Sequence, residues 1–336
     1  MVKADKQTGR FHLFVSAAIL LAIFTFAACS SDGPTGPLTK LRIATFKSQD
    51  YLPFHSMKDQ GFSKRNGLEL QEVSVQGGAA ALAAMESDEA DVGYVGSVPT
   101  FSAAEHGIIP AKVVPVAANN FADSDHPITA VLANESIGNW KDLEGLYIGV
   151  LSANSVNAAA LKGRLLLEGV RDFHLVEIPV ANIGLALAGG NVAAAAMNEP
   201  FLAQSLLRGD GKILGWVVGG APFESMEFTM IVFRTEAYRN NPEAVKAFLR
   251  SHLQAVAWIN QNPEAARSLL ARELDMSKEV GRRVRMPRWP TDARNAPEVL
   301  NRNQMILVDI GFLKAPVPLD RFYDQTLLEE VLGENR

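Results

Sequence analysis

Short apolar runs alternate along this chain with longer segments in which apolar residues recur at helical spacing. The short runs are typical of buried strands, and the longer segments are typical of helices that cover a sheet. From residue 235 onward the pattern is helical only, and the helices expected from residues 242, 263 and 297 each begin with proline. This order of elements predicts an α/β protein with mixed sheets flanked by helices.

The elements can be placed by residue range. The expected strands are residues 41–46, 68–75, 92–95, 113–118, 128–133, 147–150, 175–178, the run that begins at 191, 213–218 and 228–234. The expected helices are one from about residue 52, then 79–85, one opening at 97, 139–145, 156–167, 183–188, 242–260, 263–274, 297–310 and one near 319–332.

Two stretches share one pattern and indicate an internal repeat. Residues 90–107 and 191–201 each contain a strand of small residues that runs into a helix start with a proline, Pro99 in the first and Pro200 in the second. Taken alone, the first stretch also fits an ordinary strand-to-helix turn. Taken together, the two predict two lobes on one α/β plan, with a ligand cleft where the carboxyl ends of the strands face each other.

Length and composition narrow the function classes. The 336 residues are 48% hydrophobic and 21% charged, which is ordinary for a globular protein and long enough for two domains. The formal net charge is -5 and no basic patch is interleaved with aromatic residues, so we expect no nucleic-acid partner. The only cysteine is Cys29 and the six histidines are scattered, so no disulfide framework, metal site or cofactor is predicted.

Residues 1–28 have the features of an export signal. A basic start is followed by an apolar run, residues 13–26, which is too short to span a bilayer comfortably. The ending Phe26-Ala27-Ala28-Cys29 resembles the lipobox of bacterial lipoproteins, although phenylalanine stands where leucine is usual. The resemblance implies cleavage before Cys29 and lipidation of its thiol; a plain secretory signal is the alternative. Residues 29–39 are rich in glycine, proline and serine and predict a flexible tether.

We therefore expect the protein in the periplasm or at the outer face of the cytoplasmic membrane. The lipid on Cys29 would be its only membrane attachment. The tether would let a folded body stand away from the lipid surface.

Several segments, taken in order, resemble one protein family. They are LRIATFK at 41–47, the glycine pair at 77–78, residues 91–107, DLEGLYIGV at 142–150, NEPF at 198–201, PEAVKAFL at 242–249 and AWINQNPEAA at 257–266. Their order and spacing are similar to those of the solute-binding proteins of ABC importers for nitrate, sulfonate and taurine, including the relatives that bind pyrimidine precursors. The resemblance extends from about Leu41 to Tyr323.

This resemblance implies a two-lobed periplasmic-binding-protein fold of type II, with two hinge crossings and no catalysis. We place the crossings near Thr129–Ala133 and residues 228–234. Lobe one would comprise residues 40–130 and 235–336, and lobe two would comprise residues 131–234. The implied partners are a small-molecule ligand and an ABC permease with its ATPase, and we expect a monomer.

The family's cleft residues transfer to positions that mostly follow strand ends. The implied ligand-binding residues are Lys47, Ser48, Gly77, Gly78, Gly96, Ser97 and Val98 from lobe one, Ser152, Asn154, Ser155, Asn198 and Glu199 from lobe two, and Met226 and Phe228 near the second crossing. The family often has a more aromatic or Asp-Pro-type segment where this chain has Asn198-Glu199-Pro200. That departure bears on the identity of the ligand.

The two ionisable residues expected nearest the cleft argue for different ligands. Lys47, together with the helix starts at Gly78, Ser97 and Ser155, favours an anion. Glu199 would accept hydrogen bonds from an amine or an amino-pyrimidine, unless it caps its own helix while Lys47 points into solvent. We expect a small organic anion or zwitterion, similar to a sulfonate, taurine or nitrate. A pyrimidine or another nitrogen-rich heterocycle is the alternative.

Two other function classes compete with capture for an importer. A related fold serves in a thiamine-pyrimidine synthase, which relies on a cysteine-rich motif and a histidine. Here Cys29 falls in the signal and no serine lies in a GxSxG turn, so we expect no enzyme. A sensory ligand-binding module that works with a membrane kinase is the other alternative, although this sequence contains no signalling domain.

Overall fold

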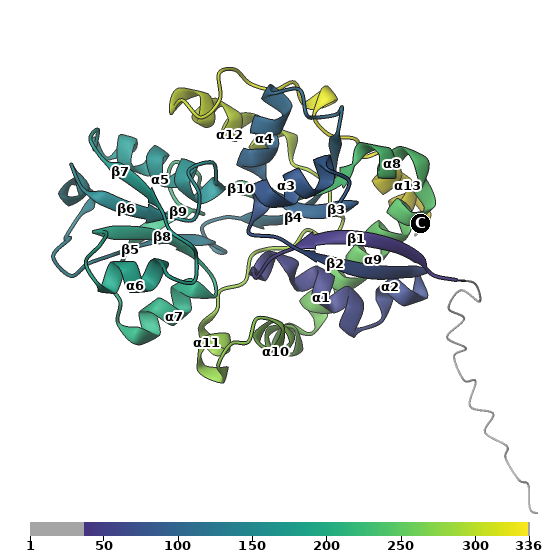
Figure 1. Cartoon of the computed structure of the whole chain (residues 1–336), viewed down its shortest axis with the longest axis horizontal. Coiled ribbons are helices and arrows are strands. Elements are labelled where there is room, and N and C mark those ends of the chain that lie inside the picture. Colours follow the sequence, from purple (N-terminus) through teal and green to yellow (C-terminus); the bar gives the residue numbers. More distant parts are fainter. Residues whose placement is uncertain (1–36, 335–336) are drawn as a thin grey trace, which may run out of the picture. The chain divides into compact units, whose positions relative to one another are not determined.

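The computed structural model describes residues 37–334, which form two five-stranded mixed sheets with helices on their faces (Figure 1). The expected two-lobed α/β fold is confirmed. The first sheet, in the order β2-β1-β3-β10-β4, comprises β1 Thr39–Thr45, β2 Leu68–Ser74, β3 Val92–Gly96, β4 Val113–Ala122 and β10 Met226–Arg234. The second sheet, in the order β7-β6-β8-β5-β9, comprises β5 Thr129–Ala133, β6 Tyr147–Val150, β7 His174–Glu177, β8 Ala194–Asn198 and β9 Lys212–Val218. The predicted signal peptide, Cys29 and the tether up to residue 36 lie outside the described residues.

The two sheets repeat one topology. In the first sheet, β2, β1 and β3 are parallel, and β10 runs antiparallel to both β3 and β4. In the second sheet, β7, β6 and β8 are parallel, and β5 runs antiparallel to both β8 and β9. Pro99 follows β3 and Pro200 follows β8, so the two stretches that indicated a repeat occupy equivalent places.

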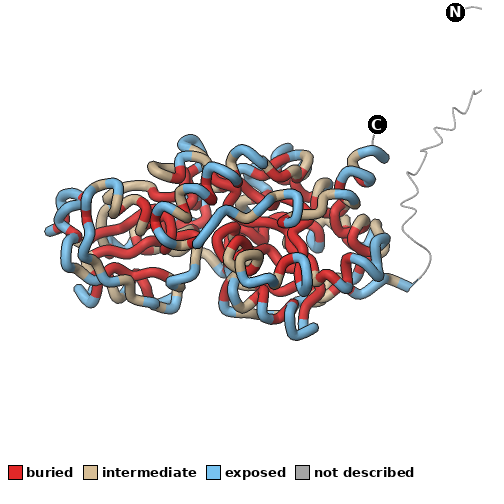
Figure 2. Tube along the Cα trace, turned by 90° about the horizontal axis from the view of Figure 1, so that it is seen from above, coloured by how far each residue is buried: buried red, intermediate tan, exposed pale blue. Residues whose placement is uncertain are grey.

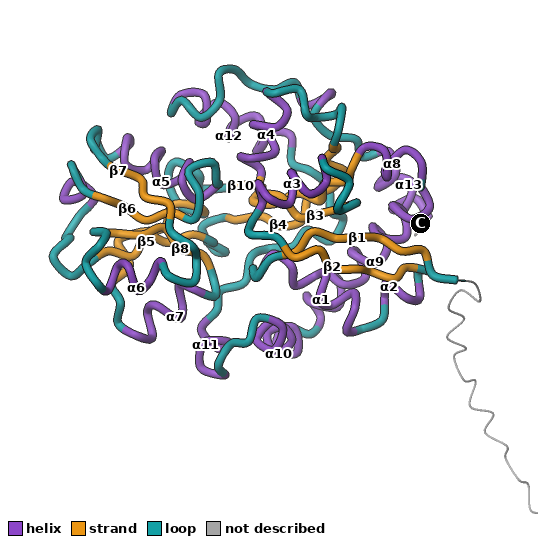
Figure 3. The backbone as a smooth tube through the Cα atoms, in the orientation of Figure 1, coloured by secondary structure: helices purple, strands orange, loops and turns teal. Residues whose placement is uncertain are grey.

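Buried strands carry the core of each lobe. β4, at one edge of the first sheet, and β5, inside the second sheet, are buried at every residue, and Figure 2 shows buried segments running through the interior of the molecule. Helices cover both faces of each sheet (Figure 3), which is why these strands are largely apolar instead of alternating apolar with polar residues.

The chain crosses between the sheets in two loops, residues 123–128 after β4 and residues 219–225 after β9. The sequence places the crossings near Thr129–Ala133 and residues 228–234; each of these segments is a strand that pairs within one sheet, and the crossing loop comes before it. Residues 226–234 therefore belong to the first sheet and not to lobe two. The two loops meet at Gly219, where φ is +84° and a Cβ would lie only 2.5 Å from the carbonyl oxygen of Asp123.

The helices pack against different parts of the two lobes. They are α1 Leu52–Asp59, α2 Phe62–Arg65, α3 Gly78–Glu86, α4 Ser97–Glu105, α5 Val156–Leu167, α6 Ile183–Ala188, α7 Phe201–Arg208, α8 Thr235–Asn240, α9 Pro242–Gln261, α10 Pro263–Glu273, α11 Lys278–Arg283, α12 Pro297–Asp309 and α13 Thr326–Glu334. The long helix α9 packs against α1, α2 and α13, whereas α11 contacts α7 and α12 contacts both α5 and β10. The segment after β10 therefore touches both lobes. In the described part of the chain, no helix has the length and apolar content needed to cross a bilayer.

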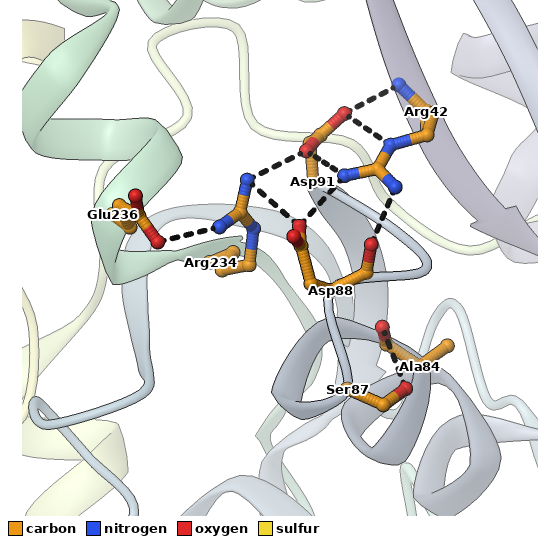
Figure 4. Close-up of polar contacts among 7 residues, drawn as sticks. All are labelled: Arg42, Ala84, Ser87, Asp88, Asp91, Arg234 and Glu236. Carbon is orange, nitrogen blue, oxygen red and sulfur yellow. Dashed lines mark hydrogen bonds and ion pairs between the residues drawn. The ribbon is translucent and has the colours of Figure 1, made fainter.

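A cluster of charged side chains links strands of the first sheet (Figure 4). It lies at the end of the sheet opposite the carboxyl ends of β1 and β3. Asp91, just before β3, accepts hydrogen bonds from Nε of Arg42 at 3.1 Å and from Arg234 at 3.2 Å. Burial opposes ionisation of Asp91, but these hydrogen bonds outweigh it and hold the pKa of Asp91 below its usual value. Asp88 and Glu236 extend the cluster at the surface. The cluster thus joins β1, β3 and β10.

Candidate functional site

Two adjoining cavities lie where the strand ends of the two sheets face each other. The first cavity has a volume of about 260 Å³ and the second about 540 Å³. Residues that follow β1, β2 and β3 line the first cavity from one side, and residues that follow β6 or end β8 line it from the other. This is the position at which open α/β sheets bind their ligands. The first cavity is lined by Phe46, Ser48, Asp50, Gln76, Gly77, Gly78, Ala79, Ala80, Gly96, Pro99, Leu151, Ser152, Asn154, Ser155, Val156, Asn157, Asn198, Phe228 and Thr229.

Most of the predicted site residues line one of these cavities. Those on the first cavity are Ser48, Gly77, Gly78, Gly96, Ser152, Asn154, Ser155, Asn198 and Phe228. Lys47 and Glu199 line the second cavity. Contact between any of them and a ligand stays a prediction.

Three predicted residues, Ser97, Val98 and Met226, line neither cavity. Ser97 and Val98 form the first turn of α4 and are buried, because this turn packs into the core directly after Gly96. Met226 begins β10 and belongs to the main apolar core. Their place in the sequence next to the cleft residues therefore does not give them a place on the cavity wall.

Sequence reasoning missed several lining residues, among them Phe46, Leu151, Asp50 and Asn157. Phe46 directly follows β1 and Leu151 directly follows β6, and these two strands are equivalent in the repeat. Each places one apolar residue ahead of the polar loop, so the repeat could have indicated both. Asp50 and Asn157 lie inside helical turns, where no local signal distinguishes them from ordinary surface residues.

Asp50 is buried, with 3% of its surface exposed, and is held by polar side chains. Its carboxylate accepts hydrogen bonds from Oγ of Ser48 at 2.5 Å and from Nδ2 of Asn120 at 2.6 Å. Oδ1 of Asn120 in turn accepts from the backbone N–H and the hydroxyl of Thr229, at 3.1 and 2.8 Å. Burial raises the pKa of Asp50, and the hydrogen bonds from Ser48 and Asn120 oppose that rise. The arrangement fixes a carboxylate at the cavity wall.

The second sheet presents amide groups to the same cavity. Oγ1 of Thr129 lies 3.0 Å from Oδ1 of Asn157 and 2.7 Å from Oδ1 of Asn198, and it can donate its single proton to only one of these oxygens at a time. The amide nitrogens of Asn157 and Asn198 make no hydrogen bond to the described residues, and both side chains line the first cavity. They can therefore donate to a ligand. Thr129 fixes the orientation in which they do so.

The ammonium of Lys47 is engaged by another side chain. Nζ of Lys47 lies 2.7 Å from Oδ2 of Asp275, and both side chains are mostly exposed. An exposed ion pair of this kind is weak, but it places a negative charge beside the expected cation of the cleft. The electrostatic argument that Lys47 recruits an anion is weakened accordingly.

Glu199 acts as a cap for the helix that follows it. Its Oε2 accepts the backbone N–H of Ala203 at 3.0 Å, and its Oε1 accepts that of Arg285 at 3.3 Å. Burial raises the pKa of Glu199 to about 7, although both N–H groups oppose the rise. This is the helix-capping role that the sequence left open. Because Arg285 follows α11, the same carboxylate also joins the C-terminal segment to the second lobe.

The start of α3 offers backbone donors to the first cavity. Gly77 has φ +137°, and α3 begins after it with no side-chain cap. Gly77, Gly78, Ala79 and Ala80 all line the cavity. The first N–H groups of a helix have no partner within the helix, so those of α3 can donate to an acceptor group of a ligand. By contrast, α5 is capped by Oγ of Ser155, which accepts from the backbone N–H of Ala158 at 3.2 Å.

Comparison with known proteins agrees with this architecture. The chain is 22% identical over 338 residues to YtlA of Bacillus subtilis (strain 168), described provisionally as a binding protein, with 96% of this chain and 97% of YtlA covered. Its fold matches that of the alkanesulfonate-binding protein SsuA from Xanthomonas axonopodis pv. citri, with a TM-score of 0.67, 18% identity, and 88% of this chain and 98% of SsuA covered.

Two further solved structures share the fold. The periplasmic nitrate-binding protein NrtA from Synechocystis PCC 6803 matches with a TM-score of 0.70 and 14% identity, covering 88% of this chain and 89% of NrtA. The desulfurization enzyme DSZB matches with a TM-score of 0.65 and 18% identity, covering 88% of this chain and 99% of DSZB. Residues 35–273, well over half of the chain, match the NMT1-like family. This protein therefore belongs to the NMT1-like family.

Proposed function

We propose that this protein is an extracytoplasmic solute-binding protein that captures a small polar organic molecule and delivers it to an ABC importer. One observation carries the proposal: two sheets of equivalent topology line a single cavity from opposite sides with polar groups that a ligand could bridge. Membership of the NMT1-like family and the fold shared with sulfonate- and nitrate-binding proteins support it.

Ligand capture would proceed by closure of the two lobes. Within residues 37–334, only the loops 123–128 and 219–225 connect the sheets through the backbone, so a rotation about them would change the width of the cleft. A ligand that contacts groups of both lobes binds the closed arrangement better than the open one and shifts the population toward it. The closed arrangement is then the form that the permease would recognise.

Among the ligands expected from the sequence, a zwitterion suits the first cavity better than a simple anion. No lysine, arginine or histidine is present among the described residues that line it, whereas Asp50 is. Lys47 at the second cavity is paired with Asp275. The backbone N–H groups at the start of α3 remain as donors for the acidic end of a zwitterion. A sulfonate or carboxylate that also carries an amino group meets both conditions.

Binding is favoured over catalysis by the residues of the cavity. DSZB shows that an enzyme can use this fold, so the fold alone does not decide. The described lining of the first cavity contains serine, asparagine and one aspartate but no cysteine or histidine that could act as nucleophile or base toward a serine. Serine, asparagine and aspartate side chains of this kind suit recognition of a ligand by hydrogen bonds. We also propose that a lipid on Cys29 anchors the protein outside the cytoplasmic membrane and that the body is monomeric.

A ligand screen tests the proposal. Protein purified from cells producing the full chain is heated in the presence of sulfonates, amino-sulfonates, nitrate and amino-pyrimidines. A true ligand stabilises the protein by about 2.7 kcal/mol at a hundredfold excess over its Kd. Ser48→Ala in the first lobe and Asn198→Ala in the second should each weaken this stabilisation. Binding that both variants leave unchanged, or turnover of the added compound, would overturn the proposal.

A further inference from the structure

Asp50 is the one ionisable side chain among the described residues that line the first cavity. Three contacts hold it in place: Ser48 and Asn120 donate to its carboxylate, and Nδ2 of Asn119 donates to its backbone carbonyl at 3.0 Å. Asn119 and Asn120 belong to β4, a buried and otherwise apolar strand of the first sheet. This polar pair contacts Asp50 on one side and Thr229 on the other.

The carboxylate of Asp50 has no positive partner in the described part of the chain. Its hydrogen bonds come from the hydroxyl of Ser48 and the amide of Asn120, and no lysine, arginine or histidine contacts it. Burying a charge without an opposite charge costs free energy. An asparagine would avoid that cost, with its oxygen accepting from Asn120 and its amide nitrogen donating to Oγ of Ser48. The described residues therefore supply no opposite charge that would hold Asp50 ionised, whereas a cationic group of a ligand would supply one.

A ligand can supply what the protein lacks at this point. A carboxylate has two oxygens with about four acceptor positions, so the two side-chain contacts leave room for further donors. Phe46 and Phe228 line the same cavity, and aromatic faces attract cations. Across the cavity, the amide nitrogens of Asn157 and Asn198 are donors that need acceptors.

We propose that Asp50 determines the specificity of the site by accepting a hydrogen bond from a nitrogen group of the ligand. The ligand is of the class that carries N–H at one end, as a protonated amine or an amino-substituted heterocycle, and hydrogen-bond acceptors at the other. The N–H end contacts Asp50 on the first lobe, and the acceptor end lies between the start of α3 and the amides of Asn157 and Asn198 on the second lobe. This inference rests on the proposed function, because it names the chemistry of the molecule that the site captures.

The test compares compounds that differ only in the nitrogen group. Taurine is measured against ethanesulfonate, β-alanine against propionate, and 4-aminopyrimidine against pyrimidine, by calorimetry on protein purified from the full chain. The variants are Asp50→Asn, which keeps the size and an acceptor for Asn120, and Asp309→Asn, which removes one exposed charge on α12 as a matched control. Circular dichroism and thermal unfolding establish that both variants are folded.

The expected result is that at least one nitrogen compound binds and its partner without the nitrogen group binds at least tenfold more weakly. Asp50→Asn should remove that preference, and Asp309→Asn should keep it. The two amine pairs test a cationic nitrogen group, and the pyrimidine pair tests a neutral amino group. Tighter binding of the compounds that lack the amino group overturns the role of Asp50 while the capture function stands, as does a preference that survives Asp50→Asn. If none of the six compounds binds the wild-type protein, the Asp50 proposal falls, and if the wider screen is also empty, the proposed function falls with it.

Discussion

Gly96 is the position at which a single methyl group should hold the two lobes apart. It ends β3 in the first sheet, and a Cβ added there would lie 2.9 Å from Cγ2 of Val156 at the start of α5. Carbon atoms normally approach to about 3.5–4.0 Å, so the overlap is about 0.6–1.1 Å. Gly96 has φ -61°, which alanine adopts without strain, so the contact across the cleft is the main obstacle. Val156 is β-branched and in a helix, and its side chain cannot easily rotate away.

We therefore expect Gly96→Ala to disfavour the arrangement in which these residues meet. Overpacking of this kind costs about 1–3 kcal/mol, which corresponds to about a 5- to 150-fold change in an equilibrium constant. Small-angle scattering should show a larger radius of gyration for the variant, and the affinity for any ligand that bridges the lobes should fall by up to the same factor. The added removal of two methyl groups in Val156→Ala should restore both.

A matched control is available on the same strand. A Cβ at Gly93 would lie 3.5 Å from the nearest atom, the end of the flexible Met85 side chain, so Gly93→Ala should change neither measurement. If Gly96→Ala scatters and binds like the wild-type protein, the lobes do not meet at this contact in solution. Failure of Val156→Ala to rescue it would show that the effect of Gly96→Ala arises within the first lobe.

Three further predictions concern stability and anchoring. Asp91→Asn removes a largely buried carboxylate that accepts hydrogen bonds from Arg42 and Arg234, and it should lower the free energy of unfolding in urea by about 1–3 kcal/mol. Asp88→Asn, at an exposed position, should lower it by less than about 1 kcal/mol. Equal losses in the two variants would contradict the role of burial. The pKa of Glu199 is raised from 4.5 to about 7, so between these pH values the folded state keeps a proton that the unfolded state has lost. The free energy of unfolding of the wild type relative to Glu199→Gln should therefore fall by up to about 3 kcal/mol as the pH rises from about 4.5 to 7. If chemical unfolding shows the same difference between the two proteins across this range, the raised pKa is contradicted. Cys29→Ala should release the protein from membranes or leave it unprocessed on gels; a processed variant that still fractionates with membranes would rule out the lipid anchor.

The elements of the fold were predictable where their signals are local. The expected ranges for β6, α5 and α6 agree with the structure, because an apolar run bounded by turn residues, or a helical period after a serine cap, is sufficient to define such elements. The sheet that a strand joins is not a local property. β10 follows β9 in the chain but pairs with β3 and β4, which precede it by more than a hundred residues, and sequence order alone groups residues 226–234 with the second lobe.

Some residues of the candidate site were likewise predictable from local sequence, and others were not. Residues directly after strand ends, such as Ser48, Gly77 and Ser152, line the cavity, because the topology of an α/β sheet brings those ends to one edge. Asn157 and Thr229 lie within α5 and β10 and reach the cavity only through the packing of those elements. Conversely, Ser97 stands next to Gly96 in sequence but is buried, since the first turn of α4 enters the core.

The charge of the site shows why the ligand could not be inferred from neighbouring residues alone. Lys47 and Glu199 are the ionisable residues that the sequence places nearest the cleft, yet Lys47 is paired with Asp275, 228 positions away, and Glu199 accepts N–H groups from its own helix and from Arg285. Both groups therefore have partners within the protein before any ligand arrives. Asp50 is contacted only by neutral groups, from Ser48 and Asn120, and burial raises its pKa, so a cationic group of a ligand would be its first partner of opposite charge. In a cleft assembled from distant segments, the groups available to a ligand depend on long-range pairing, which the residues next to the cleft in sequence do not reveal.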